Sequence, residues 1–368
     1  MTLNYCKNLM NQKKQINHFY NNLVFKLSEK NKSCALATVT AVVGSTPQIP
    51  GCSALFGKKG LLAGTVGGGE TELSVTKAAT KLIRSKKSGY FRFSLNHEIG
   101  DNQGPICGGG MNILVDANPE IHLPVFEAVN TALRQRKPGV LLTFFTQSEA
   151  ATTITRDWLT GENWPEKSAG LPELLKEIVA AKLANPVAGD FKEIPLSEPR
   201  EKENRLVFVE TILPPSLLIV AGAGHVGKAL TRTGNWLGFE VAVWDDRPDF
   251  ATFKNLPEAH HVFSGDIAQM KKTLPPGKDT FVVIVTRGHT KDAEFLKEFI
   301  NEDVAYIGMM GSKRKVIQVR RLFLDNGWAT EEKWNCVHTP IGIEIGSKTV
   351  NEIAISIAAQ LIQEKNRK

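Results

Sequence analysis

The stretch "LLIVAGAGHVGKALTRTGNWLGFEVAVWDD" (residues 217–246) decides the fold of the second half of this 368-residue chain. An apolar strand leads into the turn Gly222-Ala-Gly224-His-Val-Gly227. A helix follows, and a second strand ends at Asp245, about 20 residues after the turn, as in a dinucleotide-binding βαβ unit. Because glycines let the backbone approach a phosphate, and a helix N-terminus offers it free N–H groups, we expect a nucleotide or phosphorylated ligand here. A turn kept for packing alone is the alternative.

The same alternation of strand and helix continues to the end of the chain. Strands are expected in "TFVVIVTRGH" (280–289) and "VAYIGMMGSKRK" (304–315). A helix is expected in "TVNEIAISIAAQLI" (349–362), where Thr349 and Glu352 have the spacing of a capping box. This alternation predicts a parallel sheet covered by helices, that is, a Rossmann-like doubly wound domain.

The proline break "LPPS" marks the domain boundary, so we expect a first domain over Met1–Leu213 and the Rossmann-like domain over Pro214–Lys368. The first domain mixes helical periodicity with short β-branched runs and predicts an α/β fold with a mixed sheet. Its expected elements are a helix over Tyr5–Lys30, a strand over Ser33–Val43, a hairpin turning at Lys58–Gly60, a helix after Gly69, strands over 90–96, 111–116, 139–147 and 205–212, and helices over Ile121–Arg136 and Leu171–Leu183.

Composition and charge argue against several classes of protein. The net charge of +7 favours an anionic ligand, but the basic residues are dispersed with few aromatics among them, so nucleic acid is not an expected partner. No apolar run is long enough to span a membrane, and residues 1–22 lack the apolar core of a signal peptide. The five cysteines are scattered without C-x-x-C spacing, which argues against a zinc site or a disulfide framework. We therefore expect a cytoplasmic protein with reduced thiols.

Asp245 and Arg247 leave the identity of the ligand open. An acid in this place normally selects a free ribose 2′-hydroxyl, whereas an arginine accepts a phosphate. His225 lies inside the glycine turn and would be close to any bound phosphate, although a residue at this place more often only starts the helix.

Two polar loops follow strands of the expected parallel sheet, at the edge that faces the ligand in such folds. In "TRGHTKD", His289 and Asp292 could form an acid–base pair, or Asp292 could cap the next helix with His289 on the surface. In "GSKRK", Ser312 and Lys313 begin a helix that could hold an anion or present a solvated face.

The first domain holds a triple glycine before a helix. Gly67, Gly68 and Gly69 could bind an anion with their backbone N–H groups, although the acidic residues of the first helical turn also suit the helix dipole.

A second glycine-rich loop surrounds a single thiol. In "GPICGGGMNIL" (104–114), Cys107 is followed by Gly108 and Gly109. Glycines provide little apolar packing, so this thiol is expected to be accessible, unlike Cys34, for which burial in a packed strand is the expectation. As a thiolate, Cys107 would be a soft ligand for a metal or a carrier of sulfur.

Together these motifs resemble those of the xanthine dehydrogenase accessory proteins, the XdhC and CoxI family. The matching pieces run almost from end to end. They are "LATVTAVVGSTPQIPG" (36–51), "GTVGGGETE" (64–72), "ICGGGMNIL" (106–114), "LLIVAGAGHVGKAL" (217–230), "VWDDRPDFA" (243–251), "VTRGHTKD" (285–292), "YIGMMGSKRK" (306–315) and "HTPIGIEIGSKTVNEIAISI" (338–357). The last three, in this order behind the glycine turn, are highly specific to that family.

The resemblance implies an accessory role rather than catalysis. Family members bind the molybdopterin cofactor, support its sulfuration and help to load it into xanthine dehydrogenase-type hydroxylases. For this chain the resemblance implies a molybdopterin-type molybdenum cofactor, in the mononucleotide or the cytosine dinucleotide form. It further implies a client hydroxylase and a cysteine desulfurase as partners, and Cys107 as a contact to molybdenum or sulfur. We expect the cofactor in a cleft between the domains, with its phosphate end on the glycine loops, and a homodimer.

The chain departs from the family at two places. The family often has Pro-Arg where this chain has Pro47-Gln48, and often has a cysteine where this chain has Gly69. These departures remove one anion contact and leave Cys107 as the better thiol.

Two other functions stay open at this point. The Rossmann-like domain could serve an NAD(P)-dependent oxidoreductase, in which case NADH would bind tightly and hydride transfer would be measurable. It could also form a nucleotide-binding regulatory module without chemistry. The chain has no cysteine clusters of iron–sulfur spacing and is too short to be the whole dehydrogenase.

Overall fold

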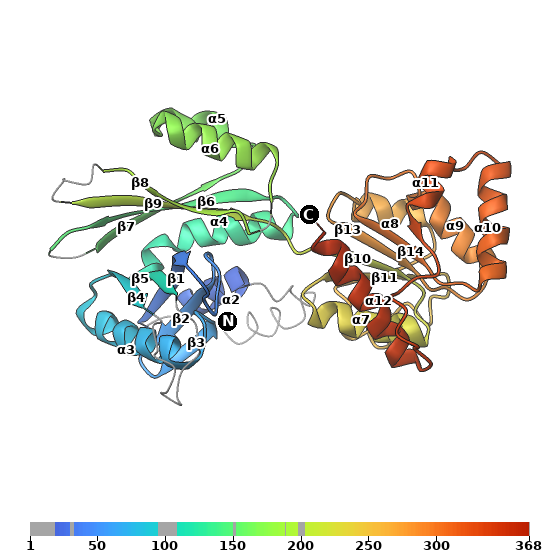
Figure 1. Ribbon diagram of the computed structural model, residues 1–368, viewed down its shortest axis with the longest axis horizontal. Coiled ribbons are helices and arrows are strands. Elements are labelled where there is room, and N and C mark those ends of the chain that lie inside the picture. Colours follow the sequence, from blue (N-terminus) through green and yellow to red (C-terminus); the bar gives the residue numbers. More distant parts are fainter. Residues whose placement is uncertain are drawn as a thin grey trace, which may run out of the picture. The chain divides into compact units, whose positions relative to one another are not determined.

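The computed structural model describes residues 19–29, 33–94, 109–149, 152–187, 189–197 and 203–367 (Figure 1). The chain divides into two compact units, the first ending at Pro214 and the second beginning at Pro215. Of the helix expected over Tyr5–Lys30, the described part is α2 (Phe19–Leu27), and residues 1–18 lie outside the described residues.

The second unit is built on a six-stranded parallel sheet with the strand order β12-β11-β10-β13-β14-β15. Its strands are β10 (Leu217–Ala221), β11 (Glu240–Asp245), β12 (His261–Ser264), β13 (Thr280–Ile284), β14 (Tyr306–Met309) and β15 (Val337–His338). Strands β10, β11 and β12 follow one another toward one edge of the sheet. The chain then returns to the other side of β10, where β13, β14 and β15 follow one another toward the opposite edge. In such doubly wound sheets the ligand crevice lies outside the carboxyl ends of the two strands at this reversal.

Helices cover both faces of the parallel sheet, as the sequence predicted. They are α7 (His225–Trp236), α8 (Ile267–Thr273), α9 (His289–Phe299), α10 (Lys313–Asp325), α11 (Glu331–Asn335) and α12 (Val350–Lys365). Leu218 and Val220 pack with α7 and α12, whereas Ile219 packs with α9 and α10 on the other face. Because both faces are buried, the strands are continuous apolar runs. The predicted capping box of Thr349 and Glu352 is present at the start of α12.

The described residues of the first unit form two antiparallel sheets, with the orders β3-β2-β1-β5-β4 and β7-β6-β9-β8. Their strands are β1 (Cys34–Val43), β2 (Ser53–Gly57), β3 (Gly60–Gly64), β4 (Gly89–Ser94), β5 (Gly110–Asp116), β6 (Gly139–Gln147), β7 (Thr152–Leu159), β8 (Phe191–Pro195) and β9 (Asn204–Ile212). The predicted α/β class is confirmed in both units. The strand pairs described in the first unit are antiparallel, whereas the sequence predicted a mixed sheet.

The burial of β1 explains that difference. Cys34 and Leu36 face helices α2 and α4 (Leu123–Arg134), while Ala35 and Ala37 face α3 (Gly69–Ser85). A strand buried on both faces lacks the polar alternation typical of an antiparallel strand. The expectation that Cys34 is buried in a packed strand is confirmed.

Helices and sheets of the first unit form stacked layers (Figure 1). Helix α3 packs on the outer face of the first sheet, α2 and α4 lie between the two sheets, and α6 (Glu173–Ala184) packs on the outer face of the second. The described part of this unit also contains three short helical turns: η1 (Pro119–His122), α5 (Trp164–Lys167) and η2 (Ser168–Gly170).

A polar cluster lies between the two sheets. Asp116 at the end of β5 forms a buried ion pair with Arg156 of β7. On β9, Glu210 accepts a hydrogen bond of 3.0 Å from the Tyr20 hydroxyl of α2. Burial raises the pKa of Glu210 to about 7, against the lowering effects of the Tyr20 hydrogen bond and the Arg156 charge. The fold therefore favours the protonated carboxyl of Glu210.

We expect Glu210→Gln to flatten the pH dependence of the first unit's stability. Because the folded pKa lies above the ordinary value of 4.5, the stabilisation by the protonated carboxyl is complete below that value and is lost as the pH rises through about 7. The loss is at most about 3 kcal/mol, and the glutamine variant should not show it. Hydrogen exchange of β9 peptides across this pH range, corrected for intrinsic exchange rates, measures the difference.

The exposed Glu166 of α5 provides the control, because Glu166→Gln should keep the wild-type pH dependence. Equal loss of protection in the wild type and in Glu210→Gln would show that the burial of Glu210 does not govern this pH dependence.

Candidate functional site

A pocket of about 510 Å³ opens at the carboxyl ends of β10 and β13, where the strand order reverses. It is lined by Gly222, Ala223, Gly224, His225, Lys228, Arg247, Phe250, Val285, Thr286 and Arg287. Its volume lies within the range of small-molecule pockets, about 300–1,000 Å³. The pocket thus combines a suitable volume with the place at which this fold binds ligands.

The three glycines of the turn have different roles. Gly222 has a φ of 118°, and a Cβ there would lie 2.6 Å from the Val285 carbonyl oxygen. A Cβ on Gly227 would lie 1.8 Å from the carbonyl oxygen of Gly222, so α7 packs directly on the turn. A Cβ on Gly224 would meet nothing within 4 Å, and its φ of −72° suits any residue. Gly222 and Gly227 are therefore required by the fold, whereas the missing side chain of Gly224 leaves space in the wall of the pocket.

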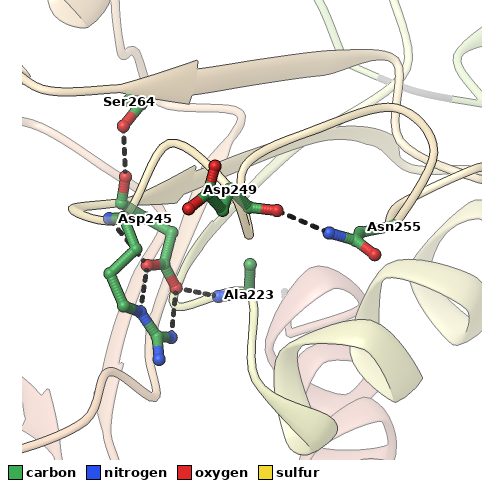
Figure 2. A network of polar contacts seen from close by, with 6 residues as sticks. Ala223, Asp245, Asp249, Asn255 and Ser264 are labelled. Carbon is green, nitrogen blue, oxygen red and sulfur yellow. Dashed lines mark hydrogen bonds and ion pairs between the residues drawn. The ribbon is translucent and has the colours of Figure 1, made fainter.

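Asp245 joins the glycine turn to the end of β11 (Figure 2). Its carboxylate is buried and accepts a hydrogen bond of 2.7 Å from the Ala223 N–H. It also accepts three hydrogen bonds from Arg247, of 3.0 Å from the backbone N–H, 2.9 Å from Nε and 3.0 Å from Nη2. The Ser264 hydroxyl of β12 donates to the Asp245 backbone carbonyl at 2.9 Å. Asp245 thus holds the turn and the Arg247 side chain in one arrangement.

The pair of Asp245 and Arg247 is charged. Burial raises the pKa of Asp245, but the hydrogen bonds from Arg247 and from the Ala223 N–H outweigh it and hold this pKa below its ordinary value. The hydrogen bond to Asp245 raises the pKa of Arg247. The guanidinium also lies 3.8 Å from the centre of the Phe250 ring, which fixes its orientation further.

The wall of the pocket is electropositive. Lys228, Arg247 and Arg287 contribute cations, and no acidic residue is among the residues that line the pocket. The N-terminus of α7, with its free N–H groups, lies at the same place. His225, the first residue of α7, is exposed and lines the pocket, and its predicted place beside a bound phosphate stays a prediction. The arrangement suits an anionic ligand.

Asp292 is the centre of a second group of polar contacts at the same sheet edge. Its fully buried carboxylate accepts hydrogen bonds from the Thr286 hydroxyl at 2.6 Å and the Thr286 N–H at 3.2 Å. It also pairs with Lys315 of α10, which donates to the Met310 carbonyl at 3.0 Å. The loops after β13 and β14 are tied together in this way. His289 begins α9 and its side chain is not described, so the acid–base role predicted for His289 and Asp292 stays a prediction.

Ser312 and Lys313 begin α10 without lining the pocket. The Ser312 hydroxyl accepts a hydrogen bond of 3.4 Å from the Lys315 N–H and so caps the helix. Lys313 is exposed. The cofactor contacts predicted for these two residues stay predictions.

The triple glycine of the first unit adopts a conformation that favours glycine. Gly67, Gly68 and Gly69 have φ values of 131°, 69° and 55°. A Cβ on Gly68 or Gly69 would meet nothing within 4 Å, whereas one on Gly67 would lie 2.9 Å from Cγ of Pro47. The backbone alone therefore accounts for the glycines, and the anion site predicted here stays a prediction.

Cys107 and Gly108 lie outside the described residues, so their predicted roles, and the expected meeting of glycine loops from both domains on one cofactor, stay predictions. Gly109 is described, and a Cβ there would lie 2.3 Å from the Ser45 carbonyl oxygen. Close approach of the backbone after β1 thus explains at least this glycine of the run. Burial raises the pKa of the Cys34 thiol to about 12, which suits an inert core residue.

Six residues of the pocket were not singled out from the sequence: Ala223, Lys228, Phe250, Val285, Thr286 and Arg287. Lys228 lies one helical turn after Gly224, and this spacing is a signal that could have indicated it. Thr286 and Arg287 begin the loop "TRGHTKD", which the sequence placed at the ligand-facing edge of the sheet, but only His289 and Asp292 of that loop were proposed as site residues. No sequence signal indicated Phe250.

Among the described residues, no group of three or more His, Cys, Asp or Glu side chains is arranged to hold a metal ion. Within the same residues, no helix combines the length and apolarity needed to cross a membrane.

Two family models match the chain. The model of the XdhC Rossmann domain matches residues 218–361, and that of the XdhC and CoxI family matches residues 27–94. A curated relative, a probable xanthine dehydrogenase subunit of Bacillus subtilis (strain 168), is 24% identical over 350 residues, which cover 95% of this chain and 98% of that protein. The uncharacterized protein YqeB of Escherichia coli (strain K12) is 23% identical over 342 residues, which cover 93% of this chain and 45% of YqeB.

A solved structure has the same fold. The crystal structure of a xanthine dehydrogenase from Bacillus halodurans matches with a TM-score of 0.69 and 24% identity, over 95% of this chain and 96% of that one. The two family models together match more than half of the chain, one in each unit, and the pieces of sequence that carried the resemblance fall largely within the matched ranges. The resemblance is confirmed: the chain belongs to the XdhC and CoxI family.

Proposed function

We propose that this protein is an accessory factor that binds a molybdopterin-type cofactor and supports its sulfuration and its insertion into a xanthine dehydrogenase-type hydroxylase. The observation that carries the proposal is the electropositive pocket at the strand reversal, in which Gly224 leaves space beside the N-terminus of α7. Family membership and the name of the Bacillus subtilis relative support the link to this class of enzyme.

The chemistry of the pocket fits the phosphate end of such a cofactor. The N–H groups at the start of α7 would donate to phosphate oxygens across the gap at Gly224. Lys228 and Arg287 would balance the charge, and Arg247 is already oriented by Asp245. The bound group would supply the molybdenum centre that the client enzyme needs. The residues of this chain would hold its phosphate and orient it.

An accessory role fits the pocket better than catalysis of a redox step. Two acids at this sheet edge, Asp245 and Asp292, are buried in ion pairs rather than presented to a substrate, and the exposed Asp246 does not line the pocket. The strand order and the glycine turn favour the alternative of an NAD(P)-dependent oxidoreductase. Asp245 weakens that alternative, because its oxygens are already used by Ala223 and Arg247.

We also propose the partners of this protein and its location in the cell. The client would be a xanthine dehydrogenase-type hydroxylase, with a cysteine desulfurase as the source of sulfur, and the factor would act in the cytoplasm, as a homodimer. Cys107 would be the thiol that contacts molybdenum or carries sulfur.

We expect Gly224→Ala to remove the ligand while leaving the fold intact. The added methyl group has space within the protein and an ordinary backbone conformation, but it would occupy the place of the phosphate. After expression in a host that makes molybdopterin, the pterin that co-purifies, measured by fluorescence and mass spectrometry, should fall at least about tenfold, the factor that corresponds to about 1.4 kcal/mol.

Gly277→Ala is the matched control, because it adds a methyl group elsewhere in the same unit, where the nearest atom lies at an ordinary 3.5 Å. Equal pterin in the wild type and in a folded Gly224→Ala variant would argue against this pocket as the cofactor site. Absence of pterin from the wild type would argue against cofactor binding itself.

Cys107→Ser tests the thiol separately. We expect this variant to keep its yield and to lose most of the activation of the client hydroxylase, because a hydroxyl group neither binds molybdenum as a soft ligand nor carries sulfur. The exposed Cys336 serves as the control, and Cys336→Ser should behave as the wild type. Unchanged cofactor retention and unchanged client activation in Cys107→Ser would remove the proposed role.

A further inference from the structure

Asp245 stands where a dinucleotide-binding fold presents a carboxylate to a ribose, but it has no free acceptor to offer. In such folds the acid at the end of the second strand accepts a hydrogen bond from the ribose 2′-hydroxyl. A carboxylate has about four acceptor sites. Those of Asp245 receive the Ala223 N–H and the backbone N–H, Nε and Nη2 of Arg247, at distances of 2.7–3.0 Å. A ribose diol would therefore find no acceptor on this side chain.

Arg247 is the group that this part of the pocket offers instead. A guanidinium carries five N–H donors in one plane. Asp245 engages Nε and Nη2, so the two N–H groups of Nη1 and the second of Nη2 point away from the carboxylate. The Phe250 ring covers one face of the guanidinium at 3.8 Å, and the side chain is 32% exposed within the pocket wall. A guanidinium held in this way is suited to the oxygens of a phosphate.

The surrounding charges favour an anion with two negative charges. Lys228 and Arg287 line the same pocket. The acid beside Arg247 in the sequence, Asp246, is exposed and does not line the pocket. A neutral diol gains little from three neighbouring cations, whereas a phosphomonoester carries up to two negative charges near neutral pH.

We infer that Arg247 is the specificity-determining residue of this pocket, and that the pocket selects ligands with a terminal phosphomonoester over ligands that end in a free ribose diol. The inference rests on the proposed function and deepens it, because it names the form of the cofactor. Molybdopterin itself ends in a phosphomonoester, whereas its cytosine dinucleotide form ends in a ribose and a base. Asp245 is a positioning residue that acts through Arg247.

ADP-ribose and ADP-ribose 2′-phosphate, which differ by one phosphomonoester, test this selection by calorimetry on the full chain. We expect the 2′-phosphate compound to bind at least about tenfold more tightly, as for the gain of charge-assisted hydrogen bonds. Arg247→Gln should abolish the preference. Arg247→Lys, which keeps the charge and loses the planar fork, should retain part of it. Arg232→Gln is the matched control, because it removes an arginine of α7 that does not line the pocket.

The Asp245→Asn variant distinguishes a role of Asp245 in positioning Arg247 from a role in the folding of the unit. Its glycine turn should remain folded, as judged by hydrogen exchange of α7, while the preference for the 2′-phosphate falls toward that of Arg247→Gln. Equal affinities of the two compounds, a preference that survives Arg247→Gln, or binding of neither compound would overturn the inference. The proposed function is judged separately, by whether molybdopterin co-purifies with the wild type.

Discussion

The pocket depends on one buried carboxylate. Asp245 receives the N–H of Ala223 from the glycine turn and the fork of Arg247 from the loop after β11, so a single group fixes both walls. Burying a charge is costly unless it is paired and hydrogen-bonded, and here both conditions are met. The turn is fixed further by the Gly222 N–H, which donates to the Trp244 carbonyl at 2.7 Å. A pocket held in this way is organised before its ligand arrives, which lowers the entropy lost on binding.

The same device recurs at the neighbouring strands. Asp292 joins the loop after β13 to Lys315, which lies beyond β14. Both Asp245 and Asp292 are buried carboxylates at the sheet edge, and each accepts a hydrogen bond from a backbone N–H group and pairs with a basic side chain. Lys228 and Arg287 line the pocket at this edge. This division of acids and cations gives the edge a positive potential, which suits an accessory protein that holds an anionic group for transfer.

The elements that could be predicted from the sequence are those specified by neighbouring residues. The glycine turn, the strands around it and the capping box of α12 depend on residues close together in the chain, and all were predicted. An element whose charged side chain pairs with a residue far away in the sequence was not predicted. Strand β7 carries Arg156, whose charge is acceptable only because Asp116, 40 positions away, pairs with it. Likewise, whether Asp245 faces a ribose or Arg247 depends on side-chain directions that no spacing specifies, so the sequence left the ligand open.

In the proposed function, the second unit binds a pterin through its phosphate. Fluorescence anisotropy of the oxidised, fluorescent pterin derived from molybdopterin, before and after removal of its phosphate by a phosphatase, measures this most directly. We expect the phosphorylated pterin to bind at least about tenfold more tightly than the dephosphorylated one. Equal affinity of the two forms, or binding of neither, would contradict it.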